Sequence, residues 1–118
     1  MGVSFKDLVV WQRAVQLSLE TYRLTAAFPT SERFGLTSQM RRAAVSIASN
    51  IAEGSGKASK GGFLQSLGHA KGSLRELQTQ IVISEALGFG LKEAYEPADR
   101  LSADVSRLLI ALVKSLKN

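Results

Sequence analysis

Basic side chains are concentrated in the middle of the chain, where they could contact the phosphates of a nucleic acid. Residues 37–75 include six basic residues and one acid, Glu53. The other residues include nine of each sign, so the whole net charge of +5 belongs to this stretch. A local basic excess is typical of a protein that binds polyanions, although a solvated surface with a chance bias is the simpler alternative. The predicted phosphate-contacting residues are Arg41, Arg42, Lys57, Lys60, Lys71 and Arg75.

The run from Gly54 to Lys57, Gly-Ser-Gly-Lys, has the residue types of a nucleotide-binding P-loop but not its spacing. That motif requires a glycine five residues before its Gly-Lys pair and a serine or threonine after it. This chain has Ile51 and Ala58 at those positions, and the run follows a predicted helix rather than a strand. Two interpretations stay open, a plain interhelical turn and an anion site where a helix N-terminus adds its free N–H groups to Lys57 and Lys60.

Side chains suited to catalysis or metal binding are scarce. The chain contains one histidine, His69, and no cysteine. A di-iron bundle requires a Glu-x-x-His pair on each of two helices, whereas Ser66 stands three residues before His69. Nucleophilic catalysis requires a base beside a serine or threonine, and the sequence offers no convincing pair. We therefore expect no catalytic residue, no bound metal, no cofactor and no enzymatic activity.

Small and polar residues on two predicted helical segments indicate contact with another surface. Serine and asparagine are mediocre helix formers, and a face that meets only water more often carries Lys, Glu and Gln. Each glycine inside a helix costs about 1 kcal/mol relative to alanine, yet the next segment has two of them one turn apart. The predicted subunit-interface residues are Ser46, Ser49, Asn50, Glu53, Gly68 and Gly72. We expect Arg42 and Glu53 to pair with neighbouring helices or subunits, because about 16 Å of helix separates them.

The chain as a whole has the composition of a globular protein, with 45% hydrophobic and 21% charged residues. Its 118 residues are enough for one core, so we expect a single domain over residues 1–118. The longest uncharged apolar stretch, Leu108–Val113, is too short to span a bilayer. The first residues lack a signal-peptide pattern, so we expect a cytoplasmic protein that does not engage membranes.

Four segments with helical periodicity position these residues. They cover approximately residues 5–28, 31–53, 59–87 and 92–117, and breaks rich in proline or glycine separate them. No segment alternates with period two, so we predict no strand. Short connections between long helices favour antiparallel neighbours, and we therefore predict an all-α, antiparallel up-down four-helix bundle.

The spacing of apolar residues also predicts which face of each helix is buried. The first segment has its predicted seam at Leu8, Trp11, Val15, Leu19, Tyr22 and Ala26. In the second and third segments the seams are Leu36, Met40, Ala43, Ala44, Ile47, Ile51 and Phe63, Leu67, Ala70, Leu74, Leu77, Ile81. The last segment has its seam at Ala94, Ala98, Leu101, Val105, Leu108, Leu112 and Leu116.

Capping residues and one proline predict where the helices begin and end. The predicted N-caps are Asp7 for the first segment, Thr30 or Ser31 for the second and Ser59 for the third. Two glycines, Gly54 and Gly88, stand where a helix ends in a left-handed residue. Pro97 predicts a kink or a short break near the start of the last segment, because residues 92–94 already have helical character.

The stretch Phe34–Gly54, which reads FGLTSQMRRAAVSIASNIAEG, resembles the hallmark sequence of a bacterial four-helix-bundle family. These proteins were first met in intervening sequences of large-subunit ribosomal RNA genes and are often labelled ribosomal. Further matches at 5–14, 28–29, 72–77 and 108–117 extend the resemblance over essentially the whole chain. Lys57 departs from it by replacing the family's usual arginine, which keeps the charge but loses the bidentate fork for phosphate.

The resemblance implies a four-helix bundle that assembles as a ring-like homopentamer. The family is similar to the accessory variability protein of diversity-generating retroelements, a basic barrel that binds nucleic acid and works with a reverse transcriptase. By that analogy alone, a reverse transcriptase is a possible partner.

Taken together, the sequence predicts a non-enzymatic homo-oligomer that binds the backbone of RNA or DNA through a basic surface. A ring of five copies would carry a net charge of about +25, which strengthens sequence-independent binding. The alternative is a protein–protein interaction scaffold with no direct role in nucleic-acid binding. RNA and DNA are not distinguished, because we expect the aromatic residues to lie in the core or an interface rather than to stack on bases. These aromatic residues are Trp11, Tyr22, Phe34 and Phe63.

Overall fold

Four α-helices account for most of the chain in the computed structural model, which describes residues 4–118. The helices are α1 (Val9–Ala26), α2 (Leu36–Ser55), α3 (Lys60–Ala86) and α4 (Tyr95–Lys117). Three short 3₁₀ turns accompany them, η1 (Phe5–Asp7), η2 (Thr30–Glu32) and η3 (Lys92–Ala94). The described residues include no strand. The predicted all-α class and four-helix bundle are therefore confirmed.

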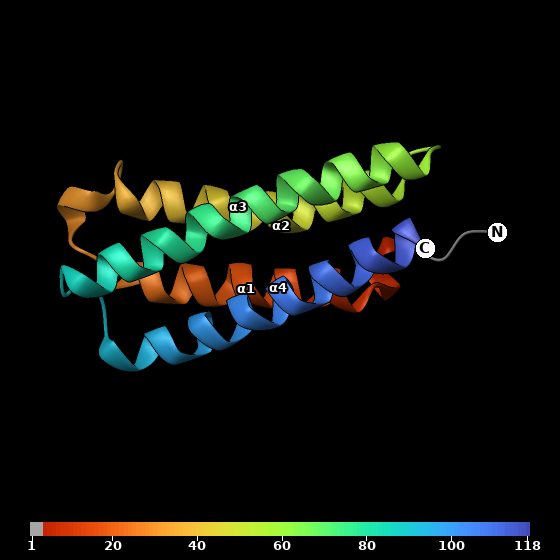
Figure 1. Cartoon of the computed structure of the whole chain (residues 1–118). Helices are drawn as coiled ribbons and strands as arrows, with labels where there is room; N and C mark the ends of the chain where they lie inside the picture. The colour runs from red at the N-terminus through yellow and green to blue at the C-terminus, as the bar shows by residue number, and fades with distance from the viewer. Residues whose placement is uncertain (1–3) are drawn as a thin grey trace.

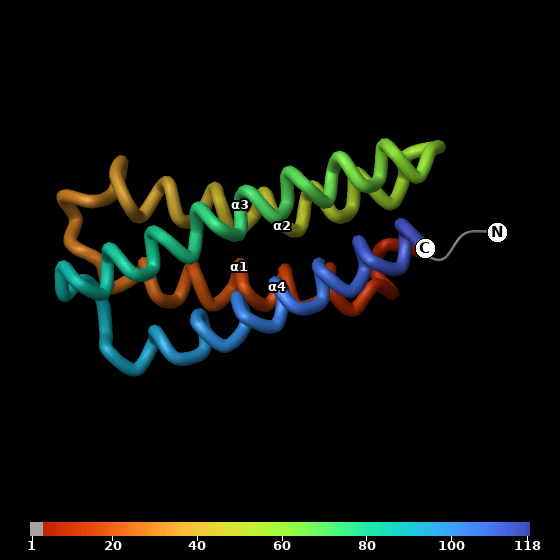
Figure 2. Tube along the Cα trace, in the orientation of Figure 1, coloured from red at the N-terminus to blue at the C-terminus, as the bar shows by residue number. Residues whose placement is uncertain are grey.

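Each helix runs back along the one before it, as the colours of Figures 1 and 2 show. The bundle is elongated, with principal extents of 46 × 23 × 20 Å. The α2–α3 turn, the start of α1 and the C-terminus lie at one end of the long axis (Figure 1). We call the half of the bundle nearest this end the turn half and the other the distal half. A groove lies between α3 and α4, mainly in the turn half.

The core lies where the sequence predicts it on α2 and α3. The seam residues Met40, Ala43, Ala44, Ile47 and Ile51 of α2 are at most 3% exposed, as are Leu67, Ala70, Leu74, Leu77 and Ile81 of α3. Ser46 Oγ on α2 lies 3.0 Å from Ser73 Oγ on α3, and this contact joins the midpoints of the two helices. The predicted seams of α2 and α3 are confirmed.

The predicted seam of α1 is confirmed at Leu8 and Trp11, which pack against the core, and is wrong farther along the helix. Leu19 and Tyr22 are exposed, whereas Thr21 and Thr25 are buried beside Leu17. The two threonines tolerate burial because each hydroxyl donates to a carbonyl of its own helix, at 2.8 Å in both cases. The apolar residues that face the core on α1 are Val10, Ala14, Leu17 and Leu24. A second, partly exposed apolar stripe is therefore left on the outside of α1.

Two predicted N-caps are wrong and one is confirmed. Asp7 lies within the η1 turn, and Leu8 stands at the N-cap of α1 without a side-chain hydrogen bond. The η2 turn takes up Thr30 and Ser31, so α2 begins later, and the carboxylate of Glu32 accepts the Leu36 N–H at 3.1 Å. Ser59 caps α3, because its hydroxyl accepts the Gly62 N–H at 3.0 Å.

The two predicted C-terminal glycines have different roles. Gly88 has a φ of +76°, which confirms the left-handed end of α3. Gly54 lies inside α2, which continues to Ser55, so its predicted role is wrong. A β-carbon on Gly54 would lie 2.7 Å from Ser66 Cβ, and the glycine therefore permits α2 and α3 to approach closely.

Pro97 occupies the first turn of α4, after the separate turn η3. Its missing N–H costs no hydrogen bond there, because the first N–H groups of a helix have no partner within it. Of the two predicted alternatives, the structure shows the short break.

Candidate nucleic-acid interface

The two halves of the bundle carry very different charges. When each helix is divided at its midpoint, the turn half comprises residues 4–17, 46–72 and 106–118. It holds eight basic and two acidic residues, a net charge of +6. The distal half holds seven basic and eight acidic residues, a net charge of −1. The fold therefore gathers more than the whole excess charge of the chain into one half of an elongated molecule.

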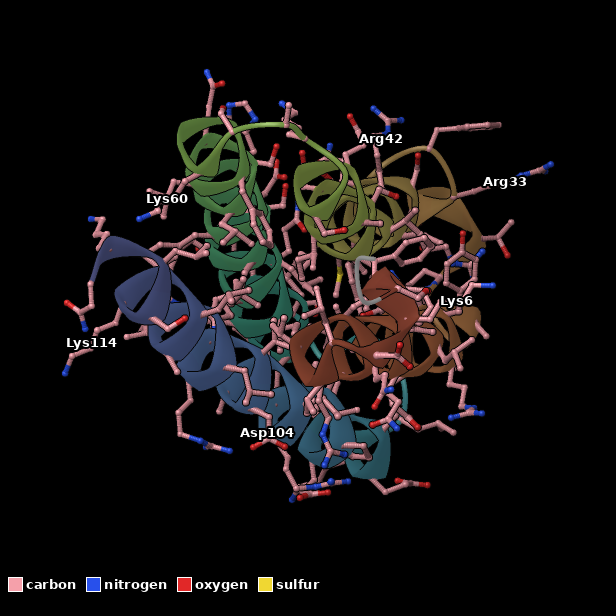
Figure 3. All side chains as sticks on the ribbon, turned by 90° about the vertical axis from the view of Figure 1, so that its right-hand side faces the viewer. Lys6, Arg33, Arg42, Lys60, Asp104 and Lys114 are labelled. Atoms are coloured by element: carbon pink, nitrogen blue, oxygen red, sulfur yellow. The ribbon has the colours of Figure 1, made fainter. Side chains whose placement is uncertain are left out.

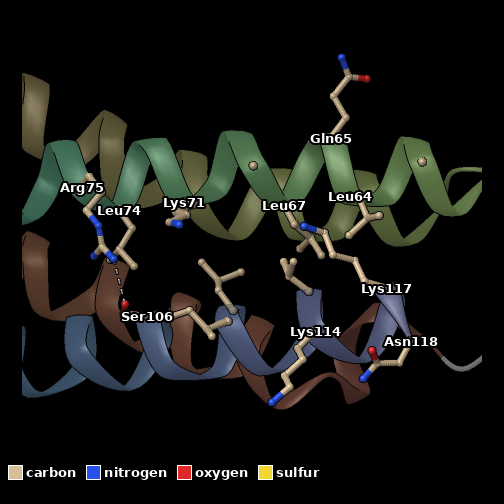
Figure 4. Close-up of a pocket in the computed structure, with 15 residues that line it drawn as sticks. Leu64, Gln65, Leu67, Lys71, Leu74, Arg75, Ser106, Lys114, Lys117 and Asn118 are labelled. Atoms are coloured by element: carbon tan, nitrogen blue, oxygen red, sulfur yellow. Dashed lines mark hydrogen bonds between the residues drawn. The ribbon is translucent and has the colours of Figure 1, made fainter.

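The groove between α3 and α4 lies mainly in this turn half, reaches Leu74 and Arg75 just past the midpoint of α3, and has a volume of about 760 Å³ (Figure 4). Its apolar lining comes from both helices and comprises Leu64, Leu67, Leu74, Leu109, Ile110 and Val113. Four basic side chains line it as well, Lys71 and Arg75 from α3 and Lys114 and Lys117 from α4. No acidic residue is among the groove-lining residues of the described chain. A ligand in the groove would meet an apolar floor and a purely cationic rim.

Arg75 bridges the two walls at the inner end of the groove. Its Nη1 donates to Gln78 Oε1 at 2.6 Å and its Nη2 to Ser106 Oγ of α4 at 3.4 Å. In Figure 4, Lys117 extends toward α3, whereas Lys114 points away from it. The charge is therefore spread along the rim rather than collected at one point.

The basic groups of the groove have no carboxylate partner among residues 4–118. The three ion pairs found there are Arg23–Glu20, Arg100–Glu96 and Arg107–Asp104, none of which involves a groove residue. Each of these pairs lies within one helix and is exposed, so it adds little to stability. The cations of the groove remain available to an external anion.

The structure separates the six predicted phosphate-contacting residues into two groups. Lys71 and Arg75 line the groove, Arg75 just past the midpoint of α3, and Lys57 and Lys60 are exposed near the α2–α3 turn. Arg41 and Arg42 belong to the distal half, on the side of α2 that faces away from α4. Seen along the bundle axis, Lys60 and Lys114 lie on one side and Arg42 on another (Figure 3). One continuous surface does not include all six.

Arg41 makes structural contacts that the sequence did not predict. Its Nε donates to Thr25 Oγ1 at 2.8 Å, and its guanidinium carbon lies 4.5 Å from the centre of the Tyr22 ring. These contacts join α2 to α1 and hold the guanidinium in a defined place. Arg42 is exposed and makes one long hydrogen bond, from Nη2 to Ser38 Oγ at 3.4 Å.

The predicted subunit-interface residues of α2 fall into two groups, one hydrogen-bonded within the bundle and one exposed. The half-buried Asn50 donates from Nδ2 to the Ser46 carbonyl at 2.8 Å and to Ser46 Oγ at 3.0 Å. Since Ser46 contacts α3 of the same chain, this part of the polar stripe has a partner within the bundle. Ser49 and Glu53 are exposed.

The two glycines of α3 face open space. A β-carbon on Gly68 or Gly72 would have no atom within 4 Å. Gly68 lines the same groove as Lys71 and Arg75. The surface predicted for subunit contact and the surface predicted for nucleic acid therefore meet at this groove.

The sequence reasoning missed the two lysines of α4, Lys114 and Lys117. The sequence pattern could have indicated them, because at 100° per residue they share one helical face with Ile110 and Val113. This face lies beside the core stripe and makes the apolar surface of α4 wider than one seam, with Ile110 54% exposed. Only the antiparallel placement of α3 and α4 brings this face next to Lys71 and Arg75.

No three His, Cys, Asp or Glu side chains in residues 4–118 lie together in a group that could hold a metal ion. No helix in the same part of the chain has both the length and the apolar character needed to cross a membrane.

These features define a four-helix bundle with a groove whose charged side chains are all basic. The model of the 23S rRNA-intervening sequence protein family matches residues 6–111, and the chain belongs to this family. The resemblance seen in the sequence is therefore confirmed. No curated protein matches the chain.

Among solved structures, the chain is similar to a protein of unknown function from the S23 ribosomal protein family of Bacteroides thetaiotaomicron. The TM-score is 0.79 at 23% sequence identity, and the match covers 92% of this chain and 98% of that chain. At this level of identity the similarity shows a shared fold and carries no functional assignment.

Proposed function

We propose that the protein is a non-enzymatic bundle that binds the backbone of RNA or DNA through its turn half. The observation that carries this proposal is the charge of +6 in the turn half against −1 in the distal half. An elongated molecule with one basic half attracts a polyanion to that half, and its neutral half is left free. Clustered cations without carboxylate partners can each replace a counterion condensed on the nucleic acid.

The four groove cations set the expected strength of the effect. Each phosphate neutralised on duplex DNA changes the slope of log K against log salt by about −0.9. Four contacts by Lys71, Arg75, Lys114 and Lys117 would give a slope of about −3.6 per chain. Affinity would then fall about 150-fold between 50 mM and 200 mM salt.

The bundle in this proposal is the unit of a ring-like homopentamer. Support comes from apolar side chains left exposed on the outside of α1, among them Val9 and Leu19. Large exposed apolar surfaces often mark interfaces. A ring would present several copies of the basic half, and their multivalent contacts with phosphates would raise the affinity above that of a single copy. Light scattering on the purified protein measures the number of copies.

A second candidate function, a protein–protein interaction scaffold, is favoured by one specific observation. The floor of the groove is apolar, with Leu64, Ile110 and Val113 accessible between the cationic side chains. A phosphate backbone gains little from such a floor, whereas an amphipathic helix with acidic flanks could bury its apolar face there. Under this alternative, nucleic acid would bind weakly even at low salt.

A matched pair of variants in η3 and α4 tests the proposal. Lys114→Gln/Lys117→Gln removes two charges from the groove, and Lys92→Gln/Arg100→Gln removes two charges from the distal part of the chain. Binding to a structured RNA and to duplex DNA is measured by fluorescence anisotropy from low to physiological salt. The groove variant should lose about 1.8 units of the slope on duplex DNA, and the distal variant should keep the wild-type slope.

Two results would contradict the proposal. Equal losses in both variants would mean that net charge, and not the basic half, determines binding. Absence of wild-type binding at low salt would favour the scaffold, and acidic helical peptides would then be the ligands to measure.

A further inference from the structure

Phe34 is the most exposed large apolar side chain in the described part of the chain, with 86% of its surface accessible. It stands between η2 and the start of α2, at the distal end of the bundle. Burial of a phenylalanine side chain is worth about 1.5–3 kcal/mol, so a ring left in water has favourable free energy to gain from a ligand. The sequence predicts Phe34 in the core or an interface, and the structure places it outside the core of the chain.

Hydrogen bonds fix the backbone on both sides of Phe34. The Arg33 N–H donates to the Thr30 carbonyl at 3.1 Å, and the Gly35 N–H donates to the Glu32 carbonyl at 2.9 Å. The Glu32 carboxylate occupies the space beside Gly35, where a β-carbon would lie 2.8 Å from Oε1. The same Oε1 accepts the Leu36 N–H, so the turn is tied to the helix that follows it.

A shallow hollow of about 630 Å³ lies beside the ring. Its lining combines aromatic, cationic and hydroxyl groups and comprises Tyr22, Arg33, Phe34, Thr37, Ser38, Arg41, Arg42, Val45 and Ser46. Three of these residues are arginines, and none of the lining residues described is acidic. This combination differs from the groove between α3 and α4, which is lined by no aromatic residue.

The three arginines are arranged to receive anions. Arg33 lies over one face of the Phe34 ring, with its guanidinium carbon 5.2 Å from the ring centre, so a base would stack on the opposite face. Arg41 is held in place by Thr25 and Tyr22, so little side-chain entropy is lost when it contacts a ligand. Arg42 is exposed and makes only the long contact with Ser38. None of the three takes part in an ion pair found in the described residues.

We propose that this hollow binds single-stranded nucleic acid, with an unpaired base stacked on Phe34 and the flanking phosphates contacted by Arg33 and Arg42. The inference rests on the proposed function and adds a second site of different specificity. An exposed aromatic ring beside cations is the usual arrangement of single-strand binding sites, in which stacking tolerates any base. A base within an intact duplex has both faces covered by its neighbours, so the ring discriminates against duplex. Arg41 positions the hollow against α1.

Substitutions of Phe34 test the proposal. Binding of a labelled 12-nucleotide oligouridylate and of a labelled duplex of the same length is measured by anisotropy for the wild type, Phe34→Leu and Phe34→Trp. Leucine keeps an apolar side chain without a π-face, and tryptophan keeps a stacking surface. Phe34→Leu should weaken single-strand binding about 5- to 150-fold, which is the range for loss of one base–aromatic stack. Phe34→Trp should retain it, and duplex binding should be the same for all three proteins.

Several outcomes would overturn the proposal. Equal binding of the single strand by Phe34→Leu and the wild type would show that no base stacks there. Equal losses for single strand and duplex would show a general effect on the protein. A change in oligomeric mass in Phe34→Leu would assign the ring to a subunit contact. If the wild type still binds duplex, any of these results overturns only the Phe34 site and not the proposed function of the groove. If the wild type binds no nucleic acid at all, the proposed function is contradicted as well.

Discussion

A methyl group added at Gly54 measures how tightly α2 and α3 are packed. The β-carbon of Gly54→Ala would lie 2.7 Å from Ser66 Cβ and 2.9 Å from Phe63 Cδ1. Ser66 Cβ is attached directly to the α3 backbone, so the clash is relieved only if a helix shifts. Overpacking of this kind costs about 1–3 kcal/mol, and the better helix propensity of alanine returns up to about 1 kcal/mol. We expect a net loss of about 1–2 kcal/mol in the free energy of unfolding.

Gly61→Ala is the matched control, because a β-carbon there would have no atom within 4 Å. Gly61 lies in the first turn of α3 at a helical φ, so alanine should stabilise the protein by about 0.4–1 kcal/mol. For a chain of 118 residues, 1 kcal/mol corresponds to about 4 °C in Tm. The two variants should therefore move Tm in opposite directions, by about 4–8 °C downward and about 2–4 °C upward.

Thermal and urea unfolding followed by circular dichroism gives both values. Each sample is measured at two protein concentrations, because association raises apparent stability by mass action. If Gly54→Ala were as stable as the wild type, the close packing of α2 against α3 would be wrong.

The remaining predictions concern the α3–α4 connection and subunit contact. Tyr95 donates from its hydroxyl to the Phe89 carbonyl at 2.7 Å, and the same oxygen lies 3.1 Å from Ser84 Oγ, so Tyr95→Phe should lower the free energy of unfolding by about 1–2 kcal/mol at pH 8. Burial raises the pKa of the Tyr95 hydroxyl above its usual value of 10.0, so the unfolded chain loses this proton at a lower pH than the folded chain. The free energy of unfolding of the wild type therefore falls as the pH rises above 10. Urea unfolding at pH 8 and pH 11 should show a smaller fall for Tyr95→Phe than for the wild type. Gly68→Ala/Gly72→Ala should reduce the oligomeric mass measured by light scattering while the isolated chain gains about 1 kcal/mol per site; an unchanged mass would remove both glycines from the predicted interface. Arg42→Ala should weaken assembly more than it weakens the isolated fold, and an unchanged oligomer would argue against a role for Arg42 in subunit contact.

Helix periodicity was sufficient to predict the cores of α2 and α3, but not that of α1. On α2 and α3 the apolar residues at helical spacing form one nearly continuous stripe, and the few apolar residues outside it, such as Val45 and Val82, do not form a second one. On α1 two apolar stripes compete, and the buried one includes Thr21 and Thr25. Each threonine satisfies its hydroxyl within its own helix, and a sequence pattern that counts threonine as polar chooses the wrong face.

The candidate sites depend on which residues the fold brings together, and this cannot be predicted from the composition of a stretch of sequence. The basic excess between residues 37 and 75 was visible in the sequence, but the fold moves Arg41 and Arg42 away from Lys71 and Arg75. The fold also brings Lys114 and Lys117 to the groove, from the part of the chain after residue 75, in which basic residues do not outnumber acidic ones. The exposure of Phe34 follows from the shape of the η2 turn, which depends on the Glu32 carboxylate accepting the Leu36 N–H. That contact replaces the Thr30 or Ser31 cap expected from the sequence.

The distribution of lysines permits a direct test of binding by the basic half. Six of the seven lysines belong to the turn half, and Lys92 is the one in the distal half. The rate of acetylation of each lysine, measured by mass spectrometry with and without bound nucleic acid, compares the two halves within one sample. Protection of Lys71, Lys114 and Lys117 with Lys92 unchanged is the result expected. Equal protection of Lys92 and the groove lysines, or protection of none under conditions where the nucleic acid is bound, would contradict binding through the basic half.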